Sequence, residues 1–217
     1  MQRLHAAARA ALSQVAATTT RHSLVELEIR LGHLKDRQFV AGISKEAYDE
    51  LQRGFTRATD FRTSTSQHVQ DFYYKDKQDV STRLSRWVQP DSKLMVQRIV
   101  KQNVFQETLK IFNCTFADAV RVSVSVETPA NDIDQPAYVI PTLVRHKFRQ
   151  VYGLDHCQYE LTEIFAGPTS ADVDLMVLEK RGATYECEIE MKQSAYNTTA
   201  EELANYMCRH ILAFVTQ

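Results

Sequence analysis

The chain has 217 residues, of which 44% are hydrophobic and 24% charged, and its formal net charge is −1. This composition is typical of a globular protein that is long enough to bury a substantial core. The near-zero net charge excludes a global electrostatic attraction to nucleic acid or to a membrane surface, and no apolar run approaches the length of a membrane span. We therefore expect no membrane partner, and a polyanionic ligand would require locally clustered charge.

The N-terminal segment 1–22 contains arginine, alanine, serine and threonine but no acidic residue. Within it, Leu4, Ala8, Leu12 and Val15 recur at roughly helical spacing. A short helix packed on the domain and an organellar transit peptide both fit this composition. We favour the packed helix, because the pattern of apolar and arginine residues is too weak to indicate import.

Segments of alternating hydrophobicity dominate the rest of the chain. Each carries β-branched or aromatic residues at every second position, which is typical of strands. In chain order the predicted strands are 24–31, 70–74, 81–88, 94–101, 104–112, 119–127, 143–152, 158–165, 172–179 and 184–192.

Two predicted helices interrupt these strands. The first spans 45–57 and follows Ser44, which is a favourable N-cap residue. The second spans 200–215 and follows Thr199, with Glu202 three positions later as a capping box. The apolar stripe of the second helix indicates a packing surface, with a partner-binding face as the less favoured alternative.

Two segments are expected to be loops. Residues 128–141 hold three of the five prolines and predict a long connection, and residues 166–171 form a weaker loop. Strand patterns resume on both sides of each loop. We therefore expect a single domain over 1–217, with the second helix within its C-terminal segment 199–217.

The polar faces of three predicted strands carry clustered charges. Side chains alternate along a strand, so charged residues two apart share a face. A strand that faces solvent usually mixes signs, because like charges on one face repel. The residues concerned are Glu26 and Glu28, with Arg30 after them, in the first strand; Arg145, Lys147 and Arg149 in a later one; and Glu186, Glu188 and Glu190 in the last.

These faces have two interpretations. In the first, the strands lie on the surface and form ion pairs. In the second, which three such strands together favour, they line the wet or liganded interior of a closed sheet. Clustered glutamates suit Mg²⁺ or Mn²⁺, and clustered arginine and lysine suit phosphate. The second interpretation therefore predicts a site for a metal-bound polyphosphate.

Other phosphate chemistries lack their motifs in this chain. The absence of a G-x-x-x-x-G-K-[ST] loop excludes a P-loop nucleotidase. A cysteine phosphatase built on Cys157 would need an arginine six residues later, where the chain has Glu163. The histidines include no H-x-x-x-H or H-E pair of the metal-ligand type.

The charged strands resemble those of the fungal and protozoal mRNA-capping RNA 5′-triphosphatases, which are members of the triphosphate tunnel metalloenzyme superfamily. The resemblance runs from Leu24 to Met191, and its most specific part is the order of the E-x-E, R-x-K-x-R and E-x-E-x-E strands. It implies a mainly β (α+β) fold, in which eight antiparallel strands close into a tunnel with flanking helices.

Position by position, the resemblance implies a metal site. ELEIRLG resembles the first acidic strand of the family, so Glu26 and Glu28 are expected metal ligands. YECEIEM resembles the last acidic strand, in which Glu190 is expected to complete the metal shell. Glu186 and Glu188 are expected to orient water or to brace the basic wall.

The same resemblance implies a basic wall. VRHKFR resembles the R-x-K-x-R strand, so Arg145, Lys147 and Arg149 are expected to contact phosphate or to pair with tunnel acids. STRLS supplies Arg83 at the early basic strand of the family.

Three further strands supply the remaining expected site residues. RVSVSVETP ends in the tunnel glutamate Glu127, and IVK supplies Lys101, with Arg98 as a competitor because of a small insertion. YELTEI resembles an acid-x-Thr strand, in which Glu160 replaces the usual aspartate and Thr162 follows it.

The resemblance implies a metal-dependent polynucleotide 5′-triphosphatase that removes the γ-phosphate of triphosphate-ended RNA in the first step of mRNA capping. Mg²⁺ or Mn²⁺ is the expected cofactor, nucleoside triphosphates are further expected substrates, and the nucleus is the expected location. No K-x-D-G motif of a guanylyltransferase is present, so we expect a separate RNA guanylyltransferase in the pathway.

Two alternatives stay open at this point. An inorganic tripolyphosphatase, or another small-polyphosphate enzyme, would use the same tunnel. A non-catalytic barrel that binds RNA ends is disfavoured, because the aromatic residues lie mostly on the apolar strand faces rather than on exposed stacking platforms.

Overall fold

The computed structural model describes residues 2–18, 24–75, 81–89, 91–111, 114–130 and 140–192, together with residues 199, 201–202, 205–206 and 209–210. None of the described helices is long and apolar enough to cross a membrane. The elements in chain order are α1 (Gln2–Thr18), β1 (Leu24–Lys35), β2 (Gln38–Ala41), α2 (Lys45–Arg57), β3 (Thr63–Lys75), β4 (Ser81–Val88), β5 (Leu94–Lys110), β6 (Ala119–Pro129), β7 (Leu143–Gly153), β8 (Cys157–Gly167), α3 (Ser170–Glu179) and β9 (Thr184–Met191).

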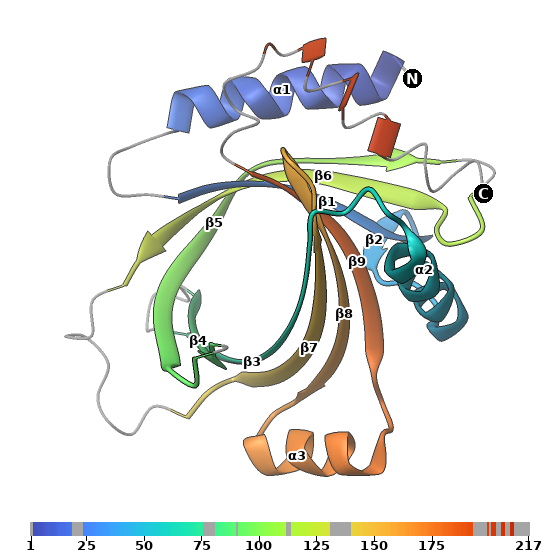
Figure 1. Cartoon of the computed structure of the whole chain (residues 1–217). Helices are drawn as coiled ribbons and strands as arrows, with labels where there is room; N and C mark the ends of the chain where they lie inside the picture. The colour runs from blue at the N-terminus through green and yellow to red at the C-terminus, as the bar shows by residue number, and fades with distance from the viewer. Residues whose placement is uncertain are drawn as a thin grey trace.

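Eight of these strands close into a ring (Figure 1). Neighbouring strands follow the order β1-β6-β5-β4-β3-β7-β8-β9, and β9 pairs back with β1. Every strand pair is antiparallel, and β2 extends the sheet as a hairpin on β1 outside the ring. The predicted fold, a closed tunnel of eight antiparallel strands with flanking helices, is confirmed, with β2 as an additional strand.

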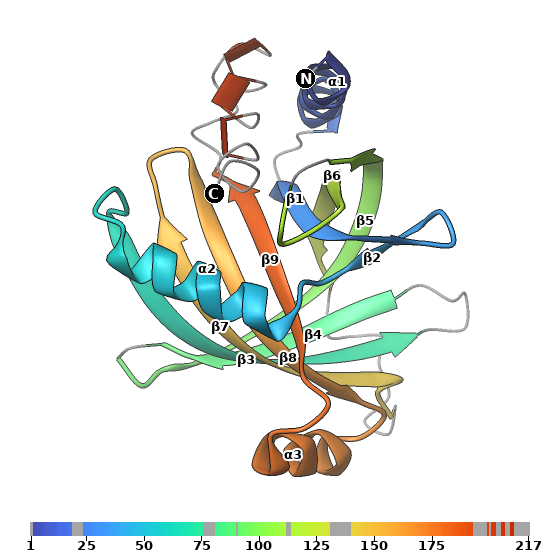
Figure 2. The ribbon, with the colours of Figure 1, turned by 90° about the vertical axis from the view of Figure 1, so that its right-hand side faces the viewer.

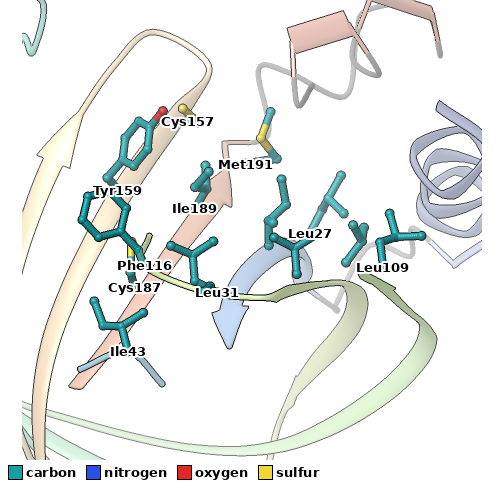
Figure 3. Packing of buried hydrophobic residues seen from close by; sticks show 14 of the residues in the cluster. Leu27, Leu31, Ile43, Leu109, Phe116, Cys157, Tyr159, Cys187, Ile189 and Met191 are labelled. Carbon is teal, nitrogen blue, oxygen red and sulfur yellow. The ribbon is translucent and has the colours of Figure 1, made fainter. Parts of the chain in front are cut away.

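The main apolar core lies outside the ring, between the outward faces of the strands and the helices (Figure 3). Leu27 and Ile29 on β1 and Ile189 on β9 are almost fully buried there. Helix α1 lies over β1, β5 and β6 and contributes the buried Ala8 and Ala11 to this core. Because these outward residues alternate with inward ones, burying them commits the intervening polar residues to the interior of the ring.

Helix α2 lies across the outer faces of β8 and β9 (Figure 2). It begins after Ser44 as predicted, and the Ser44 hydroxyl accepts a hydrogen bond from the backbone N–H of Ala47 at 3.1 Å. The Phe55 ring packs against Tyr159 of β8, with ring centroids 5.1 Å apart. The helix thus fixes the outer face of the acidic strands.

The predicted strand 172–179 is wrong, because these residues belong to helix α3. Apolar residues at alternate positions suggested a strand, but Val173, Met176 and Val177 also share one face of a helix. In the structure this face packs against β7 and β8. The hydroxyl of Thr169 accepts a hydrogen bond from the backbone N–H three residues later and caps the helix.

Several strands differ from the prediction, and β1 continues to Lys35 rather than ending at residue 31. The predicted strands 94–101 and 104–112 form the single strand β5, whose register with β6 shifts between Asn103 and Phe105. Such a bulge breaks the alternation of the sequence, which is why the strand was divided. Strand β3 begins at Thr63 rather than at 70, and the short strand β2 was missed.

The predicted C-terminal helix 200–215 lies in large part outside the described residues, as does most of the predicted connection 128–141. The described positions 201–202, 205–206 and 209–210 are helical.

Candidate active site inside the tunnel

The ring encloses a polar cavity of about 470 Å³, to which all eight of its strands contribute side chains. The structure brings together on its walls all thirteen site residues expected from the sequence, whose roles stay predictions at this point. They are Glu26, Glu28, Arg83, Lys101, Glu127, Arg145, Lys147, Arg149, Glu160, Thr162, Glu186, Glu188 and Glu190.

Strand register explains why the acids of distant segments meet. Glu28 on β1 lies directly opposite Glu190 on β9. Two residues earlier on β9, Glu188 lies opposite Glu160 on β8. Since side chains two apart share a face, this one register places the acidic residues of three strands on a continuous inner wall.

Two serines of β6 hold the carboxylates of β1. The Ser125 hydroxyl donates to Glu26 Oε2 at 3.1 Å, and the Ser123 hydroxyl donates to Glu28 Oε1 at 3.0 Å. Glu28 is only 4% exposed. A buried carboxylate needs such donors, because leaving it unsolvated is costly.

Lys101 projects from β5 onto the same carboxylates. Its Nζ forms an ion pair with Glu26 and lies 3.6 Å from Glu28 Oε2, and its backbone position is opposite Glu127. Its competitor, Arg98, is not among the residues that line the cavity. Lys101 is therefore the β5 cation of the cavity.

The basic wall is held in place by acids. Arg149 Nη1 lies 2.8 Å from Glu160 Oε2, and Lys147 Nζ lies 2.5 Å from Asp71 Oδ2. The Ser85 hydroxyl donates to the second oxygen of Asp71 at 2.6 Å. Asp71 is 1% exposed, so it acts as a buried counter-charge that orients Lys147.

Two further ion pairs cross the cavity. Arg30 Nε lies 2.8 Å from Glu188 Oε1, and Arg30 Nη2 lies 3.1 Å from Glu28 Oε2. On another part of the wall, Arg83 Nη2 lies 3.0 Å from Glu127 Oε1. Acidic and basic residues are thus interlocked rather than segregated on two separate walls.

Three important residues of this site, Asp71, Arg121 and Ser123, were not predicted, and Arg30 was placed on the charged face of its strand without a role. Arg121 and Ser123 stand at alternate positions before Glu127, so the period of a strand was sufficient to find them. Asp71 lies within a predicted strand, but its role depends on Lys147, which is far away in the sequence. No local signal could have indicated that contact.

Two glutamates of the cavity, Glu26 and Glu188, have lowered pKa values, and at Glu26 burial acts to raise the pKa while Lys101 is the main cause of the lowering. Burial acts to raise the pKa of Glu188, but the positive charges of Arg30, Arg149 and Lys147 outweigh burial and lower this pKa to about 2. Glu188 is therefore an anion at neutral pH, available as a hydrogen-bond acceptor.

Two other glutamates of the cavity, Glu28 and Glu190, have raised pKa values. Burial and the neighbouring carboxylates of Glu160 and Glu26 raise the pKa of Glu190 to about 8. Burial and the charge of Glu188 also raise the pKa of Glu28. These carboxylates hold protons more tightly than usual, and a bound cation would relieve their mutual repulsion.

The donor set of Glu26, Glu28 and Glu190 fits a hard divalent cation. Carboxylate oxygens suit Mg²⁺ and Mn²⁺, and the raised pKa of Glu190 shows negative charge that a cation would relieve. In the side-chain positions of the described residues, no group of three acidic, histidine or cysteine residues forms a ready-made metal site. Because Lys101 contacts both Glu26 and Glu28, it would have to yield those oxygens to a metal ion.

Comparison with known proteins gives one family match. The family model described as mRNA capping enzyme, beta chain, matches residues 38–210. The matched range begins after β1, so Glu26 and Glu28 are placed in the site by the structure and not by this match. No curated protein sequence matched the chain.

The fold is similar to those of solved RNA triphosphatases. The RNA triphosphatase Pct1 of S. pombe superimposes with a TM-score of 0.70 at 17% identity, covering 98% of this chain and 91% of that one. The same protein in complex with the Spt5 CTD gives 0.68 at 15% identity, covering 99% and 91%. The Mimivirus capping enzyme triphosphatase gives 0.64 at 11% identity, covering 95% and 94%. At these identities the likeness shows a shared fold.

Proposed function

This chain belongs to the mRNA capping enzyme beta-chain family of RNA triphosphatases, and from that premise we propose how its tunnel removes the γ-phosphate of triphosphate-ended RNA. The protein is a phosphohydrolase of the RNA 5′ end, and it acts in the first step of mRNA capping. The observation that carries the mechanism is the meeting of all thirteen expected charged and polar residues in one cavity.

The acidic end of the cavity is proposed to hold the cofactor. The family is metal-dependent, and Glu26, Glu28 and Glu190 would supply carboxylate oxygens to Mg²⁺ or Mn²⁺. A bound cation would neutralise charge on a γ-phosphate oxygen. The hydroxyls of Ser123 and Ser125 already orient two of the three carboxylates.

The cations of the tunnel are proposed to stabilise the phosphoryl group during transfer. Arg83, Lys101, Lys147 and Arg149 each form an ion pair with a tunnel acid, so their positions are set before substrate binds. Positioning and electrostatic stabilisation carry most of the catalysis of phosphoryl transfer. Phosphate oxygens would add to or replace the carboxylates as partners of these cations.

The attacking water is proposed to be oriented by a carboxylate of the inner wall. Glu188 is the favoured residue, because it stays ionised at neutral pH and lies among the basic residues. Glu160, which is opposite Glu188 on β8, is the second candidate. Either residue would accept a hydrogen bond from the water and so direct its oxygen toward the γ-phosphorus.

The proposed reaction indicates which enzyme acts next and which other substrates are used. The product is a diphosphate RNA end, which a separate RNA guanylyltransferase would consume by nucleotidyl transfer. We also propose that nucleoside triphosphates are hydrolysed, because the proposed contacts are with the triphosphate group, which RNA ends and nucleoside triphosphates share. The nucleus is the proposed location, since it is where the substrate is made.

The test compares substrates directly. Phosphate release is measured with triphosphate-ended RNA, a nucleoside triphosphate and inorganic tripolyphosphate, with Mg²⁺, with Mn²⁺ and with a chelator. We expect metal-dependent release from RNA that leaves a diphosphate end. Release from tripolyphosphate alone would make the protein a small-polyphosphate enzyme, and no release with either metal would contradict a catalytic tunnel.

A further inference from the structure

Two of the arginines in the cavity differ from its other cations. Seven cationic side chains line the cavity, and five of them form ion pairs with acids, namely Arg30, Arg83, Lys101, Lys147 and Arg149. Among the residues that the structure describes, no carboxylate lies within ion-pairing distance of the other two, Arg121 and Arg145. Both instead place the guanidinium over an aromatic ring.

Arg121 on β6 is held in an electrostatically unfavourable place. It lies directly opposite Arg30 on β1, and its Nε is buried without a hydrogen-bond acceptor. Like charges at directly opposed strand positions are destabilising. Burial and the positive charge of Arg30 lower the pKa of Arg121, and they outweigh the opposite effect of Glu28, Glu186 and Glu188. Glu186, an acid of the same cavity, is engaged in a hydrogen bond with Glu188.

The extra strand β2 supplies the ring beneath Arg121. The Arg121 guanidinium carbon lies 4.6 Å from the centre of the Phe39 ring. Phe39 reaches this place because β1 and β2 form a tight hairpin, with positive φ angles of 49° and 65° at Asp36 and Arg37. Gly32 permits the contact, since a Cβ there would lie 2.6 Å from the Phe39 ring. The strand outside the barrel therefore supports Arg121, a residue that lines the cavity inside it.

Arg145 on β7 has a matching environment. Its guanidinium carbon lies 5.3 Å from the centre of the Tyr73 ring on β3, and its Nε is also buried without an acceptor. The residue directly opposite Arg145 on β3 is Asp71, but the Asp71 carboxylate is occupied by Lys147 and Ser85. Arg145 thus keeps its hydrogen-bond donors for another acceptor.

The two arginines face each other across one mouth of the tunnel. In the closed ring, β6 and β7 are separated by three strands in either direction, so they lie on opposite sides. Strands four places apart in an antiparallel ring run in the same direction. Arg121 and Arg145 are each the third residue of their strand, so both lie near the same end.

The proposed metal ligands lie toward the other end of the tunnel. Glu26 lies near the start of β1, Glu127 near the end of β6 and Glu190 near the end of β9, and antiparallel pairing brings these three termini to the opposite end. A γ-phosphate bound at the acidic cluster therefore leaves the rest of a polyanionic chain to extend toward Arg121 and Arg145. Their charge attracts that chain, whereas Lys101 and Arg83 at the other end are already paired with Glu26 and Glu127.

We propose that Arg121 and Arg145 form a clamp that binds the RNA chain immediately beyond its triphosphate, through the first phosphodiester linkage and the bases on either side of it. This inference rests on the proposed function and adds a site that selects RNA over free nucleotides. A guanidinium stacked on a ring keeps its N–H edge for a phosphodiester oxygen, and the aromatic residues offer a face to a base.

The test is a series of substrates of increasing length. Values of kcat/KM are measured for tripolyphosphate, a nucleoside triphosphate, and triphosphate-ended RNAs of two, three and five nucleotides. For the parent protein we expect a rise between the nucleoside triphosphate and the dinucleotide, where the first phosphodiester appears. In Arg121→Gln the ratio of kcat/KM for RNA to that for tripolyphosphate should fall roughly tenfold, as expected for loss of a hydrogen bond to a charged group.

A second variant and a control separate this clamp from general charge effects. Phe39→Leu keeps an apolar side chain below Arg121 but removes the ring, and it should lower the same ratio by a smaller factor. Arg37→Gln removes a positive charge from the exposed β1–β2 turn and should leave the ratio unchanged. The slope of log kcat/KM for RNA against log salt should become shallower by about 0.7 in Arg121→Gln, because one phosphate contact is lost.

The outcomes distinguish this inference from the proposed function. Failure of the parent protein to release phosphate from any triphosphate-ended RNA would overturn both. If the parent acts on RNA but Arg121→Gln lowers RNA and tripolyphosphate activity equally, or leaves the rise at the dinucleotide intact, only the clamp is wrong. Thermal melting guards against a folding artefact, since removal of the Arg30–Arg121 repulsion should leave the variant no less stable than the parent.

Discussion

Glu28 and Glu190 lie directly opposite each other on β1 and β9, at the acidic end of the tunnel. In the absence of a metal ion, burial and neighbouring carboxylates raise the pKa of both residues, that of Glu190 to about 8. Two carboxylates 4 Å apart repel by roughly 1 kcal/mol in water-like surroundings and by about 4 kcal/mol at an effective dielectric of 20. The acidic cluster is therefore built for a cation rather than for stability without one.

Glu28→Gln should abolish most of the stabilisation that metal ions provide. In the parent protein, Mn²⁺ or Mg²⁺ at a hundred times its dissociation constant should raise the free energy of unfolding by about 2.7 kcal/mol. The variant should lose most of this response, yet its metal-free form should be no less stable than the parent. Thermal unfolding with and without metal measures both quantities.

The control for this change is Glu163→Gln. Glu163 lies between Glu160 and the end of β8 but faces outward, where it accepts a hydrogen bond from the Tyr185 hydroxyl at 3.3 Å. The Glu163→Gln variant should therefore keep the full stabilisation by metal ions. A Glu28 variant whose melting temperature rises with metal as much as that of the parent would show that the metal site is elsewhere.

Arg83→Ala should lower turnover by roughly 10²–10³, the usual cost of removing one well-placed charged donor. Arg86→Ala is the matched control on the same strand, because Arg86 points outward and lies 5.1 Å from the Phe72 ring centre. Steady-state phosphate release from triphosphate-ended RNA measures both. Equal losses at the two positions would show that the interior of the barrel is not where catalysis occurs.

Glu190→Gln should change how stability depends on pH in the metal-free protein. The folded pKa of Glu190 is raised to about 8, above its usual value of 4.5, so the folded state holds the proton more tightly than the unfolded state. The stability that Glu190 contributes is thus fully present below about pH 4.5 and is lost as pH rises toward 8. Chemical unfolding at pH 5, 6.5 and 8 should show the parent losing more stability than the variant over this range.

The sign of that difference is the decisive result. The variant cannot titrate at position 190, so subtracting its curve from that of the parent cancels the contributions of other groups. A difference that grows in the opposite direction, with the parent gaining stability relative to the variant at high pH, would mean that Glu190 already has a cationic partner.

Ile189→Ala should destabilise the protein by about 2–5 kcal/mol, because it leaves a cavity in the core outside the ring. Ile189 is 1% exposed, whereas Leu178 on α3 is 80% exposed, so Leu178→Ala is a suitable control and should be nearly neutral. Denaturant unfolding compares the two. A negligible loss at Ile189 would place the apolar face of β9 toward solvent and contradict the direction in which its glutamates point.

The charged strands could be predicted because the pattern that identifies each of them lies within a few consecutive residues. Glu186, Glu188 and Glu190 alternate with Cys187 and Ile189, and a period of two is enough to place the two sets on opposite faces. Helix α3 was mistaken for a strand for the same reason. Alternation at Val173 and its neighbours is compatible with both a strand and one face of a short helix, and only packing against β7 and β8 decides between them.

The contacts between strands could not be predicted from local patterns. Lys147 is held by Asp71, and Arg121 lies on Phe39, pairs that the sequence separates by long stretches of chain. Each contact depends on the closure of the ring and on strand register. Both are determined by how the outward apolar faces of all the strands pack together, and not by any one segment. The bulge near Asn103 is a further example, since it shifts the inward-facing positions of β5 from Lys101 and Asn103 to Gln106.

The most direct measurement of whether this cavity is an active site is γ-phosphate release from triphosphate-ended RNA by the parent protein and by Glu28→Gln, side by side with Mn²⁺. The parent should release one phosphate per RNA end and leave a diphosphate terminus, while the variant, melting at the same temperature without metal, should be slower by roughly a hundredfold or more. Equal rates for the two proteins would contradict the assignment of the tunnel as the site of hydrolysis.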